Sequence, residues 1–289
     1  MNNNMIPVFF SIDDNYVPCF SVAMQSLVEH ISTENYYKIH ILHKTLTDQN
    51  KEIIKSYENE NISVEFCSME SIVKKIDSAL KLRLRDYYSD TIYYRLFIQL
   101  LYPHYDKAIY LDADMVIQTD IAELYNMNIG DNLLATVRDE VVNGNETFKE
   151  YSRVALGLDP EDYFNSGMLL MNLKGMREIS IEEKFLYMLT KYNLDTIAPD
   201  QDYLNILCKG RTYKLPEIWD KMPDFGKKYK DNELKIIHYN MFRKPWHYED
   251  VPHSNVFWKY AKKTPFFDVL QKELKGYTKK QKEDDLKVQ

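Results

Sequence analysis

The sequence predicts an α/β fold with a mostly parallel central sheet and helices on both faces of that sheet. Short apolar runs alternate with helix-length amphipathic segments in the first part of the chain, in the order strand, helix, strand, helix, strand. A later apolar run, within residues 107–116, ends in two aspartates separated by one residue. Open α/β sheets bind ligands at the carboxyl ends of their strands, so this run is predicted to be a central strand whose end carries a site.

The first part of the chain resembles half of a nucleotide-binding sheet. Residues 6–12, 38–43 and 62–66 are short apolar runs and are predicted as buried strands. Residues 20–30 place apolar side chains on one helical face, and Thr47-Asp48 predicts a capped helix that runs to about residue 57. No glycine-rich phosphate loop follows the first strand. Phosphate charge would then have to be neutralised in another way, and a metal ion is the obvious choice.

The remaining elements follow from the same patterns. Further strands are predicted in the first half of 107–116 and at 133–137, 168–173 and 235–238. Helices are predicted at 91–101, 146–156, 181–192, 199–207, 256–261 and 266–274, with a short one ending at 125. Loops are predicted at 143–145 and 239–246, and the charged tail from Lys275 is predicted to be disordered. These boundaries predict one α/β domain over residues 1–262, followed by a C-terminal helix and charged tail over 263–289.

Composition limits the function classes. The 289 residues are 45% hydrophobic and 28% charged, which is normal for a soluble domain with a sizeable core, and the net charge of -7 argues against nucleic-acid binding. The three cysteines, Cys19, Cys67 and Cys208, are far apart and odd in number, so neither a disulfide framework nor a zinc cluster is expected. Residues 1–5 lack a basic region and no apolar run approaches a membrane span, so a reduced, cytoplasmic protein is predicted.

Asp112 and Asp114 are the strongest candidates for a site. In an extended chain their spacing places both carboxylates on one face, where they repel each other and are costly to desolvate. A protein keeps such a pair mainly to hold a cation or to share a catalytic proton. The alternative is a solvated strand end followed by a turn. The apolar run before Asp112 favours a ligand site.

Other polar motifs stand beside apolar segments in the same way. Taken singly, each also has a structural explanation, such as a turn for Asp13 and Asn15, a snorkelling side chain for Arg95, or an ordinary strand-end histidine for His238. The motifs are Asp13-Asp14-Asn15-Tyr16, Tyr94-Arg95-Leu96, Tyr163-Phe164-Asn165-Ser166-Gly167, Asp200-Gln201-Asp202, and His238-Tyr239 with Lys244-Pro245-Trp246.

Together with Tyr110-Leu111-Asp112-Ala113-Asp114, these motifs occur in an order and at a spacing that resembles the family 8 glycosyltransferases. That family comprises retaining sugar-nucleotide enzymes, among them bacterial lipopolysaccharide galactosyltransferases and glycogenin. The similarity runs from about Pro7 to Trp246. It implies a single α/β domain of the GT-A type that binds a nucleotide-diphospho-sugar, so that residues 1–262 would be a glycosyltransferase catalytic domain.

The resemblance implies a role for each motif. Asp112, Asp114 and His238 are implied as ligands of a divalent metal, and this mixed oxygen and nitrogen set favours manganese, with magnesium as the alternative. Asp13, Asn15 and Tyr16 are implied to bind uridine, with Tyr16 stacking on the base. The implied donor-binding set is completed by Arg95, Asp112, Ala113, Asn165, Met241 and Lys244.

The reacting centre is implied to contain Arg95, Asp200, Gln201 and Lys244. Arg95, Asn165, Asp200 and Gln201 would hold the donor sugar, and Lys244 would neutralise the departing diphosphate. Asp139 is implied to contact a sugar hydroxyl or the acceptor. Trp246 is either an anchor for its loop or a platform for a sugar, and we favour the anchor.

The activity implied is metal-dependent transfer of galactose or glucose from a UDP-sugar to an acceptor hydroxyl, with retention at the anomeric carbon. The acceptor would be a saccharide of a cell-surface glycan or glycolipid, a lipid-linked sugar or a protein. Same-face displacement, in which the phosphate takes the acceptor proton, is the family's usual mechanism. A carboxylate nucleophile is the alternative, with Asp200 and Asp202 as candidates.

One residue departs from the family pattern, and other functions stay open. Many members carry glycine at the position of Met241, where it allows close approach of the backbone to the phosphates. The main alternative is therefore a UDP-sugar binding protein with impaired catalysis. Self-glycosylation on one of the 23 tyrosines is another. The run Leu111-Asp112-Ala113-Asp114-Met115-Val116 also fits an aspartate-dependent phosphatase, although that motif normally lies on the first strand.

The C-terminal helix has an apolar edge flanked by lysines. Phe266, Phe267, Leu270 and Leu274 form this edge. The preferred interpretation is that the edge packs on the domain. The alternative is a peripheral contact with the inner face of a membrane, close to a lipid-linked acceptor.

Overall fold

The computed structural model describes residues 4–79, 90–192, 196–223, 226 and 228–288. The prediction about a targeting segment rests partly on residues 1–3, which lie outside this part of the chain. The strands are β1 (Asn4–Ser11), β2 (Asn35–His43), β3 (Ile62–Ser68), β4 (Lys107–Leu111), β5 (Met115–Ile117), β6 (Leu134–Thr136), β7 (Met168–Asn172), β8 (Thr212–Lys214) and β9 (Ile236–His238).

Helices of two kinds connect these strands. The α-helices are α1 (Val17–Val28), α2 (Asp48–Lys55), α3 (Glu70–Ala79), α4 (Ile98–Leu101), α5 (Ala122–Tyr125), α6 (Glu140–Gly144), α7 (Glu146–Val154), α8 (Leu173–Glu178), α9 (Ile181–Tyr192), α10 (Pro199–Leu207), α11 (Ser254–Ala261), α12 (Phe267–Gly276) and α13 (Lys279–Val288). The 3-10 helices are η1 (Asp14–Tyr16), η2 (Asp90–Phe97), η3 (Pro160–Asp162), η4 (Glu217–Trp219) and η5 (Asp231–Glu233).

The central sheet is mostly parallel, which confirms the predicted fold class. Its strand order is β3-β2-β1-β4-β7-β6-β8. The first four strands run parallel, β7 is antiparallel to both β4 and β6, and β8 is parallel to β6. A separate antiparallel ribbon joins β5 to β9 and pairs Met115 with His238. This pairing places His238 next to the end of the aspartate motif.

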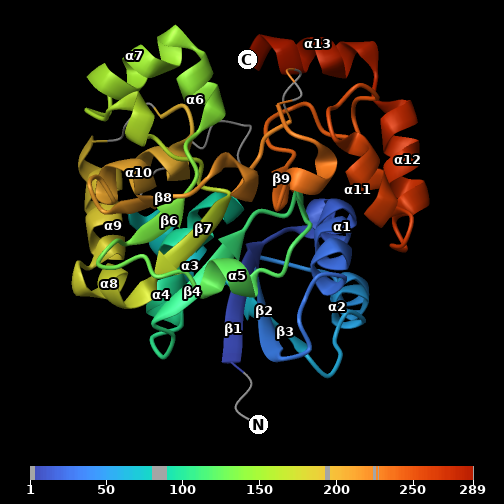
Figure 1. Ribbon diagram of the computed structural model, residues 1–289. Coiled ribbons are helices and arrows are strands. Elements are labelled where there is room, and N and C mark those ends of the chain that lie inside the picture. The colour runs from blue at the N-terminus through green and yellow to red at the C-terminus, as the bar shows by residue number, and fades with distance from the viewer. Residues whose placement is uncertain (1–3, 80–89, 193–195, 224–225, 227, 289) are drawn as a thin grey trace.

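Helices cover both faces of the sheet (Figure 1). Alternate residues of β1 face opposite sides, because Val8 and Phe10 belong to a hydrophobic cluster with α1 whereas Phe9 belongs to one with η2, α9 and α10. In Figure 1, α1 and α2 lie on one side, α8 and α9 lie on the other, and α7 and α13 lie at the end away from the N-terminus. Both faces of the sheet are therefore shielded from solvent, as is usual for a mostly parallel sheet.

A third hydrophobic cluster joins the β5–β9 ribbon to α11 and α12. Leu270 is buried in this cluster, and Phe266 and Phe267 pack against it. The apolar edge of the C-terminal helix thus packs on the domain, which is the preferred interpretation given above. Among the described residues, no helix combines the length and the apolar character that crossing a bilayer requires.

Two helix predictions are wrong in detail. Helix α1 begins at Val17 instead of residue 20, because Pro18 occupies the first turn, where its missing N–H is tolerated. Residues 91–101 form η2 and the short α4 instead of one α-helix. This segment is buried on several sides, through Tyr93, Tyr94, Leu96 and Phe97. Tertiary packing therefore determines the 3-10 geometry here, and the apolar residues do not form the single face of an amphipathic α-helix.

The predicted loop at 143–145 and the predicted disordered tail are also wrong. Asn143 and Gly144 end α6, whose first turn is capped by the Asp139 side chain accepting from the amide of Val142 at 2.8 Å. Asn145 caps α7. The tail ends α12 and forms α13, whose Asp285 accepts a hydrogen bond from the Tyr248 hydroxyl at 2.7 Å. The hydrophobic pattern also missed α3, α8 and the short β8, and it extended the strand at 168–173 into α8.

Candidate functional site

The topology brings the predicted motifs to one edge of the sheet. Asp13 follows β1 and Asp112 follows β4, and these strands are parallel neighbours whose carboxyl ends coincide. Because β7 is antiparallel to β4, the residues just before β7 reach the same edge, and the amide of Asp112 donates to the carbonyl of Gly167 at 2.8 Å. His238 arrives through the β5–β9 ribbon.

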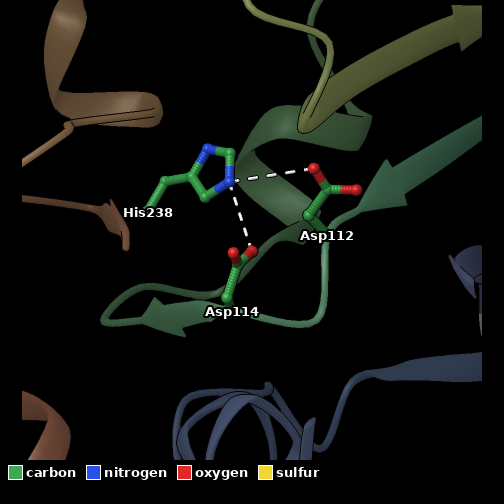
Figure 2. Close-up of side chains that lie close together, drawn as sticks. All are labelled: Asp112, Asp114 and His238. Carbon is green, nitrogen blue, oxygen red and sulfur yellow. Dashed lines mark ion pairs between the residues drawn. The ribbon is translucent and has the colours of Figure 1, made fainter. Parts of the chain in front are cut away.

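Asp112, Asp114 and His238 converge in space, as Figure 2 shows. Nε2 of His238 lies 3.2 Å from Oδ1 of Asp114 and 3.7 Å from Oδ2 of Asp112. Residues 112–114 form a turn between β4 and β5, not the extended segment argued from their spacing. The carboxylates nevertheless share a ligand face, because the turn and the ribbon direct both toward the same imidazole nitrogen.

The donor set fits a divalent metal. One ligand atom from each of the three residues lies within 4.8 Å of the others. The other ring nitrogen of His238 is 3.0 Å from Oδ1 of the buried Asp220, an arrangement that fixes the ring and leaves Nε2 to face the carboxylates. Burial lowers the pKa of His238, but Asp220 and Asp114 outweigh it and raise that pKa to about 10. Metal binding would displace this proton.

Asp220 is a site residue that the sequence analysis missed. It lies directly after η4, it is 2% exposed, and its second carboxylate oxygen has no partner among the described residues. Burial raises the pKa of Asp220 although His238 opposes this shift. Nothing in the sequence around Trp219 and Asp220 distinguishes this aspartate from a loop residue, so only the fold could identify it.

Lys244 occupies the other side of Asp114. Its Nζ forms an ion pair with Oδ2 of Asp114 and donates to the carbonyl of Tyr239 at 2.6 Å. Burial raises the pKa of Asp114, but Lys244 and then His238 outweigh it and hold that pKa well below its usual range. Trp246 is buried and packs on Phe257 with ring centroids 5.0 Å apart, which is the behaviour of a loop anchor.

Arg95 connects three motifs. It is 3% exposed, its Nη2 lies 2.9 Å from Oδ1 of Asp112, and its Nε lies 3.2 Å from Oδ2 of Asp200. Its Nη1 donates to the carbonyl of Ser166. The guanidinium also covers the ring of Tyr110 at 4.3 Å. Burial raises the pKa of Asp200 although Arg95 opposes this shift. Arg95 is therefore a buried cation that pairs with two aspartates, and the alternative prediction of a snorkelling surface residue is wrong.

Gln201 lies in a fully bonded network with a defined orientation. Its Oε1 accepts from the amide of Ser166 at 2.9 Å, and its Nε2 donates to Oδ2 of Asp139 at 3.1 Å. The same oxygen of Asp139 accepts from Nδ2 of Asn165 at 3.0 Å. Asp202 is 0% exposed and accepts from the Tyr163 hydroxyl at 2.6 Å. Asp202 thus contacts the network through Tyr163 and has no exposed surface of its own.

The first motif is partly structural. Asp13 caps η1 by accepting from the amides of Asn15 at 2.9 Å and Tyr16 at 3.1 Å. Asp14 bonds to Nδ2 of Asn50 and so ties the motif to α2. Tyr16 is 42% exposed, as a stacking platform for a base would be. Ala113 is buried in a hydrophobic cluster, so a contact between it and a donor would come from its backbone.

Gly167 permits the approach of His238. A Cβ at this position would lie 2.2 Å from Cε1 of His238 and 2.8 Å from Oδ2 of Asp112. We expect Gly167→Ala to displace the imidazole and to lower the free energy of unfolding by about 2 kcal/mol. Thermal unfolding would measure this loss. Gly144→Ala is the control, because no atom lies within 4 Å of its Cβ position; equal stability of the two variants would contradict the packing argument.

The departure at Met241 has a conformational consequence. Met241 has φ of 56°, in the left-handed region that favours glycine. We expect Met241→Gly to raise the free energy of unfolding by about 0.5 kcal/mol and to tighten donor binding, because the backbone is then unstrained. Calorimetry would measure both. Met241→Ala removes the exposed side chain but keeps the strain, so an equal gain in that variant would show that the backbone is not the cause.

The amino-acid sequence is similar to those of known proteins. The family model described as Glycosyl transferase family 8 matches residues 7–250. The chain belongs to this family. It is 29% identical over 272 residues to the lipopolysaccharide 1,2-glucosyltransferase of Escherichia coli K12, covering 88% of this chain and 76% of that protein. It is also 25% identical over 263 residues to glycosyltransferase GlyB of Streptococcus pneumoniae, covering 84% of this chain and 58% of that protein.

Solved structures of glycosyltransferases share the fold of this family 8 member. The bifunctional enzyme WbbM superposes with a TM-score of 0.79 at 26% identity, over 94% of this chain and 52% of that one. This chain thus spans about half of WbbM. The galactosyltransferase LgtC, solved with donor and acceptor sugar analogs, superposes with a TM-score of 0.71 at 24% identity, over 90% of this chain and 96% of that one. The protein is therefore a glycosyltransferase with a GT-A type fold.

Proposed function

We propose that this glycosyltransferase moves glucose or galactose from a UDP-sugar to an acceptor hydroxyl, with a divalent metal and with retention at the anomeric carbon. The observation that supports this proposal most directly is the convergence of Asp112, Asp114 and His238 beside Lys244. Carboxylates and an imidazole suit manganese, with magnesium as the alternative. A bound ion would supply positive charge to the diphosphate.

The protein's own residues would divide the remaining work. Tyr16, with Asp13 and Asn15, would bind the uridine, and Asn165 would bind the donor sugar. Lys244 would stabilise negative charge on the diphosphate as the sugar leaves, because its Nζ already lies at the carboxylate of Asp114. Its buried position would also exclude water that could hydrolyse the donor.

The hydroxyls of the donor sugar would be held by Arg95, Asp200, Gln201 and Asp139. For Asp139, a contact with the acceptor is the alternative. We do not propose Asp202 as a nucleophile, because it has no exposed surface and accepts hydrogen bonds from Tyr163 and Tyr151. Asp200 is paired with Arg95, which stabilises its charge and weakens it as a nucleophile. We therefore favour same-face displacement without a covalent intermediate.

The acceptor proposed is a saccharide of a glycolipid or cell-surface glycan. The relative from Escherichia coli K12 is named as a lipopolysaccharide 1,2-glucosyltransferase, which supports a lipid-linked sugar in the same class. We propose that the protein acts in the cytoplasm or at the inner face of the membrane, where the exposed lysines of α12 and α13 could contact anionic lipids.

A donor screen tests this function. Release of UDP from UDP-glucose and UDP-galactose, with and without manganese and with oligosaccharide acceptors, should show metal-dependent turnover of at least one donor. Binding of UDP-sugar with no turnover would instead support a binding protein with impaired catalysis. Hydrolysis of p-nitrophenyl phosphate without UDP release would support the phosphatase alternative, and a rise in intact mass with a UDP-sugar alone would support self-glycosylation.

A further inference from the structure

The C-terminal helices hold the turn that carries Lys244. The backbone amides of His247 and Tyr248 both donate to the carbonyl of Lys244, at 2.9 Å in each case. The main chain of Lys244 is thereby joined to the two residues whose side chains reach α12 and α13. Contacts that hold His247 and Tyr248 in place therefore also hold the backbone of Lys244 in place.

Both side chains of this turn are bonded to the C-terminal segment. The Tyr248 hydroxyl donates to Oδ2 of Asp285 at 2.7 Å, and the Tyr277 hydroxyl donates to the same oxygen at 2.9 Å. Nε2 of His247 lies 2.9 Å from Oε1 of Glu273, and its ring stacks on Tyr277 with centroids 4.0 Å apart. Two helices that lie beyond the matched family region therefore contact the turn directly.

Asp285 differs from the other charged residues of its helix. It is 6% exposed, whereas the other charged side chains described in α13 keep contact with solvent. Its neighbour Asp284 shows the usual arrangement, with a side chain that is 50% exposed and paired with Lys287 at 2.6 Å. Burying a carboxylate is unfavourable unless strong hydrogen bonds compensate. Two phenol donors give Asp285 this compensation and connect it to the turn.

We propose that Asp285 is a positioning residue for sugar transfer: through Tyr248 it holds the turn that presents Lys244 to the leaving diphosphate. This inference rests on the function proposed above for Lys244. It also assigns α12 and α13 to the catalytic unit, although the family match ends at residue 250 and the sequence predicts a separate tail. The segment would serve as a strap whose polar contacts set the geometry of the site.

A double-mutant cycle tests the proposal. Asp285→Ala should lower kcat about tenfold and change the KM for the donor by less than about threefold, because a misplaced Lys244 loses contact with charge that develops late. The same change in a Lys244→Ala background should lower kcat no further, since the positioned group is gone. Asp284→Ala, on the same helix, should leave both backgrounds unchanged. Equal losses from Asp285→Ala in both backgrounds would overturn the proposal.

A measurement without turnover separates this inference from the proposed function. Deuterium exchange of the peptide covering residues 239–248, in the full chain without donor, should be about tenfold faster in Asp285→Ala and unchanged in Asp284→Ala. Unchanged exchange in Asp285→Ala would overturn the strap even in an active enzyme. Faster exchange in a protein without any transferase activity would overturn only the proposed function. If Asp285→Ala does not fold, Tyr248→Phe removes the same hydrogen bond and should give the same pattern.

Discussion

Replacing Asp114 with asparagine is expected to reduce sugar transfer at least about a thousandfold, which corresponds to about 4 kcal/mol of transition-state stabilisation. Asp114 faces Nε2 of His238 with one oxygen and Lys244 with the other. The asparagine keeps an oxygen that can accept from Lys244 but loses the charge that a divalent metal requires. Manganese-dependent binding of UDP should therefore disappear in calorimetric titrations, while the protein stays folded.

Asp106→Asn provides the matched control for this experiment. Asp106 stands just before the same strand, β4, and its side chain is 77% exposed and paired with Arg177 at 3.1 Å. This substitution removes the same charge far from the ligand face, so UDP binding should keep its manganese dependence. An Asp114→Asn enzyme that transfers sugar at the normal rate would show that this carboxylate does not hold the metal.

The aspartate motif shows how far the sequence alone can go. The apolar run before Asp112 predicts a strand that ends at a site, and the parallel topology then brings the end of β1 to the same edge. The pattern cannot show which cations face the two carboxylates. The structure places Arg95 against Asp112 and Lys244 against Asp114, so the repulsion argued from their spacing is largely neutralised. Such pairings join residues far apart in the chain and leave no local signal.

The elements and residues that the sequence did not predict were missed for the same reason, because they depend on contacts between distant parts of the chain. Hydrophobic periodicity identifies segments that bury an apolar face, and it succeeded for β1, β4 and α9 for this reason. Helix α13 contacts the turn at Tyr248 through polar groups, among them Asp285 and Lys282, so its sequence looks like a solvated tail. Asp220 likewise matters only through its contact with His238. Polar tertiary contacts of this kind depend on the fold and cannot be inferred from spacing.

Lys244→Met is expected to change catalysis and metal binding in opposite directions. The methionine keeps most of the aliphatic stem, which preserves the packing of a side chain that is only 7% exposed. It removes the ammonium that pairs with Asp114 and donates to the carbonyl of Tyr239. If this ammonium stabilises the leaving diphosphate, kcat should fall about a hundredfold, or about 2.7 kcal/mol, with a smaller change in the KM for the donor.

The affinity for the metal should rise in this variant, whereas kcat falls, because Lys244 and a divalent ion compete for the same carboxylate of Asp114. Without donor, manganese should bind Lys244→Met several-fold more tightly than the wild type, since no resident cation has to be displaced. Electron paramagnetic resonance of free manganese would measure this change. Lys38→Met is the control, because it removes the same charge from a lysine of β2 that pairs with Glu65 at 2.7 Å, and it should affect neither quantity strongly. Weaker manganese binding together with normal kcat would show that Lys244 only supports the fold of its loop. Tighter metal binding in an enzyme that turns over slowly would instead mean that Lys244 holds the place of the metal before the donor arrives and acts on the diphosphate afterwards.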